Sequence, residues 1–320
     1  MLRLIALALI SLAAGLGSAG AQSYPTRTVR LILPFAPASG TDIAIRLFAD
    51  RLGPRWGKPV VIENRPGGDG LVSIGAFINA NDDHTLWVGP AGTFVVHPYE
   101  HQNLPYDAER DLIPVASLTT LVLAMSTPAS LKLNSVSDLV ALARAQPGKL
   151  NAAAANGNSD FLLFGFIKSS GLEIPKVPYR DILQAPNDLS ENRIQVLMTS
   201  LAVVNPHMQA GKVKALAVTS RQRAPSAPDV PTAAEAGYPA LELDSPVGIV
   251  GPRGMPLALR ERIAADLKAV AAEDPVIAKR LEATGQIVSV RGPAEYAATI
   301  AELRTRLAAI AKVLGIKPAQ

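Results

Sequence analysis

The sequence predicts an α/β fold divided into two domains. Short runs of β-branched residues alternate along the chain with stretches of helical periodicity, an order typical of βαβ units with largely parallel sheets. At 320 residues, the chain exceeds the usual size of a single domain. Its composition, 48% hydrophobic and 18% charged, supplies enough apolar side chains for a core and excludes the disordered and collagen-like classes.

The predicted elements follow one another in regular order. Strand patterns, which are short apolar runs bounded by Gly, Pro or polar residues, occur at 28–34, 59–63, 85–89, 115–126, 149–155, 193–199, 213–219 and 247–250. Helical spacing of apolar residues occurs at 42–52, 136–145, 257–272 and 293–314, the last with a proline where helices favour one. The proline-rich stretch 224–231 interrupts the alternation, and we interpret it as an ordered surface loop.

The first 21 residues have the pattern of a secretory signal peptide. Arg3 precedes an apolar run over 4–14, and Ala19-Gly20-Ala21 forms an A-x-A cleavage pattern. The apolar run is about half the roughly 20 residues that span a bilayer, which disfavours the alternative of a membrane anchor. We therefore expect export, with cleavage after Ala21.

Charge and cysteine content narrow the function further. The 31 Lys and Arg residues against 27 Asp and Glu give a formal net charge of +4, without the basic run expected of a nucleic-acid partner. The chain has no cysteine, which excludes disulfides, a thiol nucleophile and a lipoprotein anchor. We expect no nucleic-acid binding, and the charge mildly favours small anionic ligands.

Three turns after predicted strands are rich in small residues. They lie at 34–42, 89–93 and 156–160. Small residues let the backbone approach a ligand, and Ser39 or Thr41 can cap the helix that follows. Because ligands of open α/β sheets bind at the carboxyl ends of the strands, the turns together predict a carboxylate or other anion site. Taken singly, each is also explained as an ordinary tight turn.

Enzyme motifs are not found. The sequence has no G-x-S-x-G nucleophile turn, no Walker A run and no H-E-x-x-H pair. The run Gly68-x-Gly70-x-x-Ser73 lacks the third glycine of a dinucleotide site and the acidic residue expected downstream of it. Asp42 and Glu63 could be imagined as paired carboxylates, but nothing fixes their separation. We therefore expect no catalytic residue and no cofactor.

Two of the four histidines have the spacing of metal ligands. His97 and His101 are four residues apart, as on one face of a helix, but Pro98 would have to lie at a helix start and no third ligand is apparent. We interpret both as surface or turn residues and expect no metal site.

Specific motifs extend over nearly the whole chain after residue 21. The most distinctive are E-N-R-P-G at 63–67 and P-T-x-x-E-A-G at 231–237. Further matching segments are 24–30, 34–36 with Thr41, Asp42 and Arg46, 60–62, Thr85-Leu86, 139–150, 177–180 and 229–230. With these motifs, the chain resembles the periplasmic solute receptors of tripartite tricarboxylate transporters, also called Bug or TctC-like proteins.

The resemblance implies a two-domain periplasmic binding protein of type II, a clamshell with crossovers near 121–126 and 241–248. Domain I would comprise 22–122 and 248–290, domain II 123–247, and 291–320 would form a C-terminal helix that packs across both domains. The implied function is that of a monomeric, non-enzymatic receptor. It would capture a small carboxylate-bearing acid in the cleft and deliver it to a membrane permease of the tripartite type. The alternative is a ligand-presenting sensor subunit that docks to a signalling ectodomain such as that of a sensor kinase.

The resemblance also implies which residues meet the ligand, largely through backbone N–H groups and water. From domain I these are Phe35, Ala36, Ala38, Ser39, Gly40, Thr41, Asp42, Pro90, Ala91, Gly92 and Thr93. From domain II they are Asn156, Gly157, Asn158, Ser159, Asp160, Tyr179, Arg180, Thr199, Ser200 and Leu201. Phe35 has two possible roles, as part of the cleft wall or as packing beneath it. Arg180 could pair with a second carboxylate of the ligand or form an ion pair on the surface. Trp56 and Trp87 are expected to pack rather than to bind the ligand.

Several residues around the expected cleft differ from the family pattern. The usual glycine pair of the first loop is Ala38-Ser39, and the family's aspartate near the end of the strand pattern 193–199 is Thr199. A small residue followed by histidine is replaced by Asp160-Phe161. The resemblance therefore carries the fold more firmly than the identity of the ligand.

Overall fold

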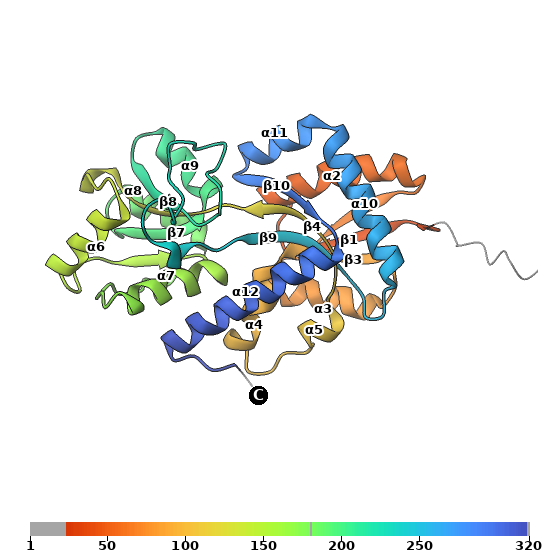
Figure 1. Cartoon of the computed structure of the whole chain (residues 1–320), viewed down its shortest axis with the longest axis horizontal. Helices are drawn as coiled ribbons and strands as arrows, with labels where there is room; N and C mark the ends of the chain where they lie inside the picture. The colour runs from red at the N-terminus through yellow and green to blue at the C-terminus, as the bar shows by residue number, and fades with distance from the viewer. Residues whose placement is uncertain (1–23, 180, 319–320) are drawn as a thin grey trace, which may run out of the picture.

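The computed structural model describes residues 24–179 and 181–318, which form two lobes (Figure 1). In the described residues, a six-stranded sheet has the order β10-β4-β9-β3-β1-β2 and a four-stranded sheet the order β6-β7-β5-β8. The chain passes between the sheets at Val122 and again between residues 218 and 245. This is the α/β, two-domain architecture with two crossovers that the sequence predicts.

The first domain contains the six-stranded sheet and the helices that cover it, on the right in Figure 1. Its elements are β1 (Val29–Leu33), α2 (Gly40–Trp56), β2 (Val60–Asn64), η1 (Gly68–Gly70), α3 (Leu71–Ala80), β3 (Thr85–Pro90), α4 (Ala91–Glu100), α5 (Ala108–Asp111), β4 (Ile113–Leu121), β9 (Ser245–Gly251), α10 (Leu257–Glu273), α11 (Pro275–Ala283) and β10 (Gln286–Arg291).

The second domain contains the four-stranded sheet, on the left in Figure 1. Its elements are β5 (Leu123–Pro128), η2 (Ala129–Leu131), α6 (Val136–Ala145), β6 (Ala152–Ala154), α7 (Asn158–Ser169), η3 (Ile182–Gln184), α8 (Ala185–Ser190), β7 (Val196–Ser200), α9 (Leu201–Gln209), β8 (Val213–Val218) and η4 (Pro239–Leu241). The chain rejoins the six-stranded sheet at Ser245, slightly before the expected boundary at 248.

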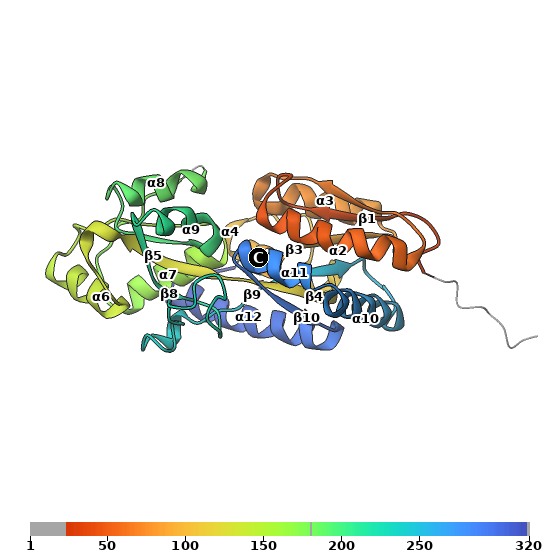
Figure 2. The same cartoon turned by 90° about the horizontal axis from the view of Figure 1, so that it is seen from above.

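The last helix, α12 (Pro293–Leu314), contacts β4 and α4 of the first domain and α7 of the second (Figure 2). The sequence defines both of its ends, with Pro293 in the first turn and Gly315, at φ 78°, in the left-handed conformation that closes a helix. Lys168 of α7 donates a hydrogen bond to the Leu314 carbonyl at 3.0 Å. The helix therefore links the two domains on one side of the molecule.

The expectation of largely parallel sheets is wrong. Among the described strands, β1 pairs in parallel with β2 and β3, and β6 with β7, while the other pairings are antiparallel. The predicted strand 115–126 is also two strands, β4 and β5, which lie in different sheets on either side of Val122. β9 returns against β4 and therefore runs antiparallel to both β3 and β4, a direction that local sequence patterns do not encode.

Both tryptophans pack within the first domain. Trp87 is completely buried, donates to Ser73 Oγ at 2.9 Å and meets Phe94 edge to face. Trp56 is half-buried and donates to an Asp266 carboxylate oxygen at 2.8 Å. Neither indole lines the cavity described below.

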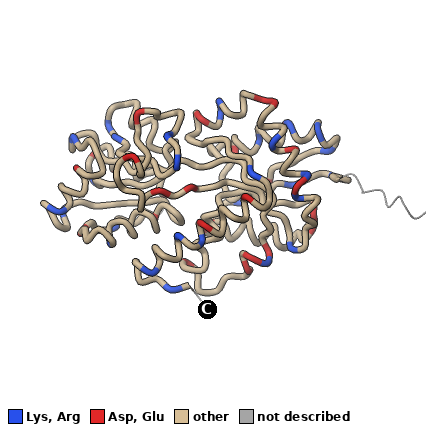
Figure 3. Tube along the Cα trace, in the orientation of Figure 1, with Lys and Arg blue, Asp and Glu red and all other residues tan. Residues whose placement is uncertain are grey.

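Charged residues of both signs are interspersed over the two lobes (Figure 3). Within the described ranges, no helix is both long enough and apolar enough to cross a membrane.

Candidate ligand-binding cleft

A cavity of about 440 Å³ lies between the two domains. Turns at the carboxyl ends of β1, β3, β6 and β7 supply most of its wall, as expected for an α/β protein. The predicted site residues that line it are Phe35, Ser39, Gly40, Thr41, Pro90, Gly92, Thr93, Asn156, Gly157, Asn158, Ser159, Thr199 and Ser200. The structure thus gathers segments that are far apart in the sequence into one space.

Four helices begin at this cavity. Residues of the first turns of α2, α4, α7 and α9 all contribute to its wall. The starts of α4, α7 and α9 have no side-chain hydrogen-bonded cap, so their first-turn N–H groups depend on backbone, solvent or a ligand. Since each helix start carries a partial positive charge, this convergence favours an anion.

The first of these starts is organised around Asp42. Its side chain is fully buried and accepts hydrogen bonds from the Ala38 N–H at 2.8 Å, from Arg46 at 2.9 and 3.0 Å, and from Asn64 at 2.8 Å. Burial alone would raise the pKa of this carboxyl, but the hydrogen bonds from Arg46, Asn64 and Ala38 outweigh it and hold the pKa below its usual range. Ser39 caps the helix by accepting from the Asp42 N–H at 3.3 Å.

The two domains touch where α4 and α7 begin. The side-chain amide of Asn158 lies over Gly92, so that a Cβ added to the glycine would be 2.3 Å from it. Asn158 donates to Ser245 Oγ at 3.3 Å, and its other amide atom, Oδ1, is shielded with no hydrogen-bond partner among the described residues. Asn158 Oδ1 is therefore a buried acceptor without a protein partner at the contact between the two domains.

Two acidic residues of the cavity wall were not expected from the sequence. Asp69 accepts a hydrogen bond from Asn156 at 3.0 Å, which connects the two domains. At the end of α4, burial and the nearby Asp69 charge raise the pKa of Glu100 to about 7, although a backbone hydrogen bond from Gly157 opposes the shift. Asp69 lies in the glycine-rich segment 67–70 after β2, and Glu100 ends α4, so neither lies in the turns at 34–42, 89–93 and 156–160.

The wall also contains residues that only the three-dimensional arrangement reveals. They are His97 and Val96 on α4, Leu121, Leu123 and Ser245 near the crossovers, Ala155, Ile182, Leu183, Ala202 and Val203 in the second domain, and Thr284 and Gln286 at the start of β10. Most are apolar or uncharged, so the cavity combines a nonpolar wall with the polar helix starts.

Some predicted site residues lie off the cavity wall. Ala36 and Ala38 are exposed on the loop, while Asp42, Ala91 and Leu201 are buried beneath the wall. Their contribution is the shape of the turns.

Two predicted side chains of the second domain are occupied elsewhere. Asp160 forms an ion pair with Lys176 at 2.5 Å, and the Tyr179 hydroxyl donates to Asp188 at 2.6 Å. Arg180 lies outside the described residues.

The expectation that His97 is a surface or turn residue is wrong. The α4 helix continues through Pro98 to Glu100, and His97 is completely buried. Its Nδ1 lies 2.5 Å from the Tyr106 hydroxyl, and its Nε2 lies 3.0 Å from the Asp69 carbonyl oxygen. His101, the residue after the helix, is half-buried.

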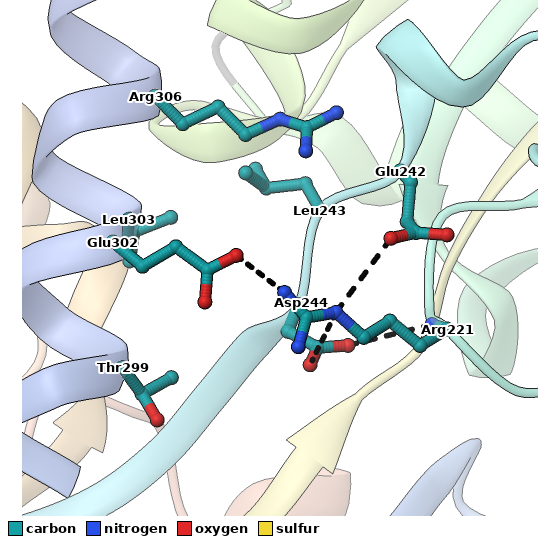
Figure 4. A pocket seen from close by; sticks show the side chains of 8 residues that line it. All are labelled: Arg221, Glu242, Leu243, Asp244, Thr299, Glu302, Leu303 and Arg306. Atoms are coloured by element: carbon teal, nitrogen blue, oxygen red, sulfur yellow. Dashed lines mark hydrogen bonds and ion pairs between the residues drawn. The ribbon is translucent and has the colours of Figure 1, made fainter. Parts of the chain in front are cut away.

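A second hollow, beside α12, is too small for an organic acid. About 20 Å³ is enclosed there, close to the space of one water molecule. Figure 4 shows Arg221 at its centre, paired with Glu302 of α12, with Asp244 at 3.8 Å and with Glu242 at 3.6 Å. These contacts attach α12 to the segment that leads back into β9.

Comparison with known proteins agrees with this architecture. The sequence model of one protein family, the tripartite tricarboxylate transporter family receptor, matches residues 44–316 of this chain. A relative from Pseudomonas sp., the UPF0065 protein in the tcbD-tcbE intergenic region, is 34% identical over 278 residues, covering 84% of this chain and 82% of that protein.

Solved structures give the same result. MatC from Rhodopseudomonas palustris with bound malate is 27% identical, covers 90% of this chain and 99% of its own, and has a TM-score of 0.75. An R. palustris protein with adipate is 28% identical, covers 92% and 99%, and has a TM-score of 0.77. The chain therefore belongs to the tripartite tricarboxylate transporter receptor family, whose members are periplasmic solute-binding receptors of the TctC and Bug type.

Proposed function

We propose that this protein captures a small organic acid in the interdomain cleft and delivers it to a membrane permease of the tripartite type. The observation that carries the proposal is the convergence of four helix starts on one cavity, three of them without a side-chain cap. Each charge-assisted hydrogen bond to a carboxylate contributes about 1.5–3 kcal/mol, so a few of them reach the roughly −8 kcal/mol of micromolar binding. Malate and adipate, the ligands named for two similar structures, are acids of this kind.

The ligand is expected to hold the two domains together. Turns of both domains line the cavity, so a bound acid contacts both only when the cleft is closed. Binding then shifts the population toward the closed form. We place the domain boundaries for this movement close to those that the sequence suggested, with 22–122 and 248–290 in domain I, 123–247 in domain II and the 291–320 segment across them. The second boundary moves to Ser245, where the chain enters the six-stranded sheet.

The first test is a thermal-shift screen of protein that has been unfolded and refolded to remove any bound ligand. The panel contains mono-, di- and tricarboxylates, acidic amino acids and aromatic acids. At 100 times its dissociation constant, a ligand adds about 2.7 kcal/mol to the free energy of unfolding, which raises Tm by a few degrees. The matched control is the uncharged diamide of each dicarboxylate hit, which is expected to give no shift. An equal response to the diamide, or silence across the panel from folded protein, would contradict the proposal.

Delivery to a permease requires an exported protein. We propose cleavage after Ala21, in the part of the chain that precedes the described residues. N-terminal sequencing of protein released from the periplasm is expected to begin at Gln22. Protein with its original N-terminus in the cytoplasmic fraction alone would contradict export.

A further inference from the structure

Three side chains of types that can bind a metal ion lie close together at the end of α4. One ligand atom from each of His97, Glu100 and His101 lies within 4.8 Å of those of the other two. The spacing i, i+3 and i+4 produces this, because a helix brings residues three and four apart onto the same side. The third ligand that His97 and His101 lacked in the sequence is thus Glu100, which stands between them.

The surroundings of His97 resemble those of a supported ligand. Metal-binding histidines usually have their second ring nitrogen hydrogen-bonded, which fixes the ring. The buried Tyr106 hydroxyl holds His97 Nδ1 in this way, at 2.5 Å. The opposite nitrogen, Nε2, lies 3.0 Å from the Asp69 carbonyl oxygen, within hydrogen-bond distance. Two atoms that bind the same ion can also be this far apart. An ion could therefore replace that hydrogen bond and leave the Tyr106 contact in place.

His101 supplies an independent observation. Its Nε2 is shielded from solvent and has no hydrogen-bond partner among the described residues. A buried polar atom without a partner costs about 1–3 kcal/mol, so such an atom calls for an explanation. Coordination to an ion is one that the neighbouring His97 and Glu100 make chemically reasonable.

We propose that His97, Glu100 and His101 bind a divalent metal ion, with Zn²⁺ the chemically best fit. Two imidazoles and one carboxylate are a known protein ligand set for zinc, in which a fourth position stays open. Imidazole also suits Ni²⁺ and Cu²⁺, whereas Mg²⁺ and Ca²⁺ prefer oxygen ligands. Because His97 and Glu100 also line the interdomain cavity, the ion would border the proposed ligand site.

Isothermal titration of tag-free protein with ZnCl₂, without organic acid, tests the site. We expect the wild type to bind one ion per chain. Loss of a group that only supports a metal ligand weakens binding roughly 10- to 100-fold, and we expect H101Q and E100Q, which each lose a ligand, to bind zinc at least that much more weakly. The matched control is H207Q. His207 is half-buried in the second domain, away from the proposed site, and its ring bonds Ser190 of the same domain. This substitution is expected to leave the zinc affinity unchanged. MgCl₂ is expected to give no comparable heat.

Two results would overturn the proposal. In the first, the wild type does not bind one Zn²⁺ ion; in the second, H101Q and E100Q bind it as tightly as the wild type does. The second result would move binding elsewhere, for example to the Asp82, Asp83 and His84 group. H97Q is not the primary variant because its side chain is fully buried and the change could unfold the chain. Circular dichroism of each variant checks folding, and the visible spectrum of bound Co²⁺ reports coordination directly, which a merely structural histidine would not affect. Because no carboxylate is present, failure here leaves the proposed receptor function standing.

Discussion

Replacing Gly92 by alanine is expected to prevent the cleft from closing fully and to weaken binding of the carboxylate. The new methyl group would lie 2.3 Å from the Asn158 amide, well inside contact distance. Asn158 has little room to yield because it is buried and bonded to Ser245. Overpacking of this kind costs about 1–3 kcal/mol, which corresponds to about 5- to 150-fold in affinity if the closed form bears the whole cost.

Calorimetry with the best carboxylate from the screen measures the loss of affinity, and small-angle scattering measures whether ligand still compacts the molecule. Gly75→Ala is the matched control, because the space around Gly75 in α3 is open and an added Cβ meets nothing within 4 Å. Adding Asn158→Ala to Gly92→Ala removes the clash and is expected to restore compaction. Unchanged affinity in Gly92→Ala would show that α4 and α7 do not meet in the bound state.

The parts of the fold that were predictable are those specified by adjacent residues. The 293–314 helix was predicted at its observed bounds, with Pro293 as the signal for its start. In the structure Gly315 accounts for its end. The 136–145 helix was also predicted at its observed bounds, and the Ser135 and Asp138 capping box accounts for its start. Such signals act within one turn of chain, so a sequence displays them directly.

The direction of strands and the change of sheet at Val122 depend on distant partners. Val122 continues an apolar run without any turn residue, and the chain changes sheets there because its neighbours pair with β9 on one side and with β7 and β8 on the other. Nothing local in the run 115–126 marks that point. The prediction could therefore locate a strand but not its division.

The residues of the candidate site also fall into those that local sequence patterns predict and those that depend on distant contacts. The turns after β1, β3 and β6 were found because small residues after strands are a local pattern. Asp69 and Glu100 were missed because each becomes part of the wall only through contact with the opposite domain, at Asn156 and near Gly157. The prediction for His97 is wrong because the helix continues through Pro98, a residue that usually ends a helix.

Replacing Asp42 by asparagine is expected to lower the free energy of unfolding by about 2–4 kcal/mol at pH 7. An amide cannot accept from the Ala38 N–H, Arg46 and Asn64 all at once, because one of its two atoms is itself a donor. Two of the four hydrogen bonds to the charged carboxylate are then lost, at about 1.5–3 kcal/mol each. The loss is reduced because Arg46 is half exposed to water and Asn64 keeps its hydrogen bond to the Phe35 carbonyl. Asp229→Asn is the control, since Asp229 is exposed and a surface change of this kind is expected to stay within about 0.5 kcal/mol.

The same substitution predicts a specific dependence on pH. The folded pKa of Asp42 lies below the unfolded value of about 4, so the ionised carboxylate stabilises the fold fully above that value. As pH falls from about 4 through the folded pKa, the wild type takes up a proton and loses this stabilisation, whereas Asp42→Asn has none to lose. Urea unfolding of both proteins at pH 7 and at several values below 4 should therefore show their difference shrinking toward acid. A difference that stays constant would mean that the hydrogen bonds of Asp42, rather than its charge, hold the first loop against the cleft.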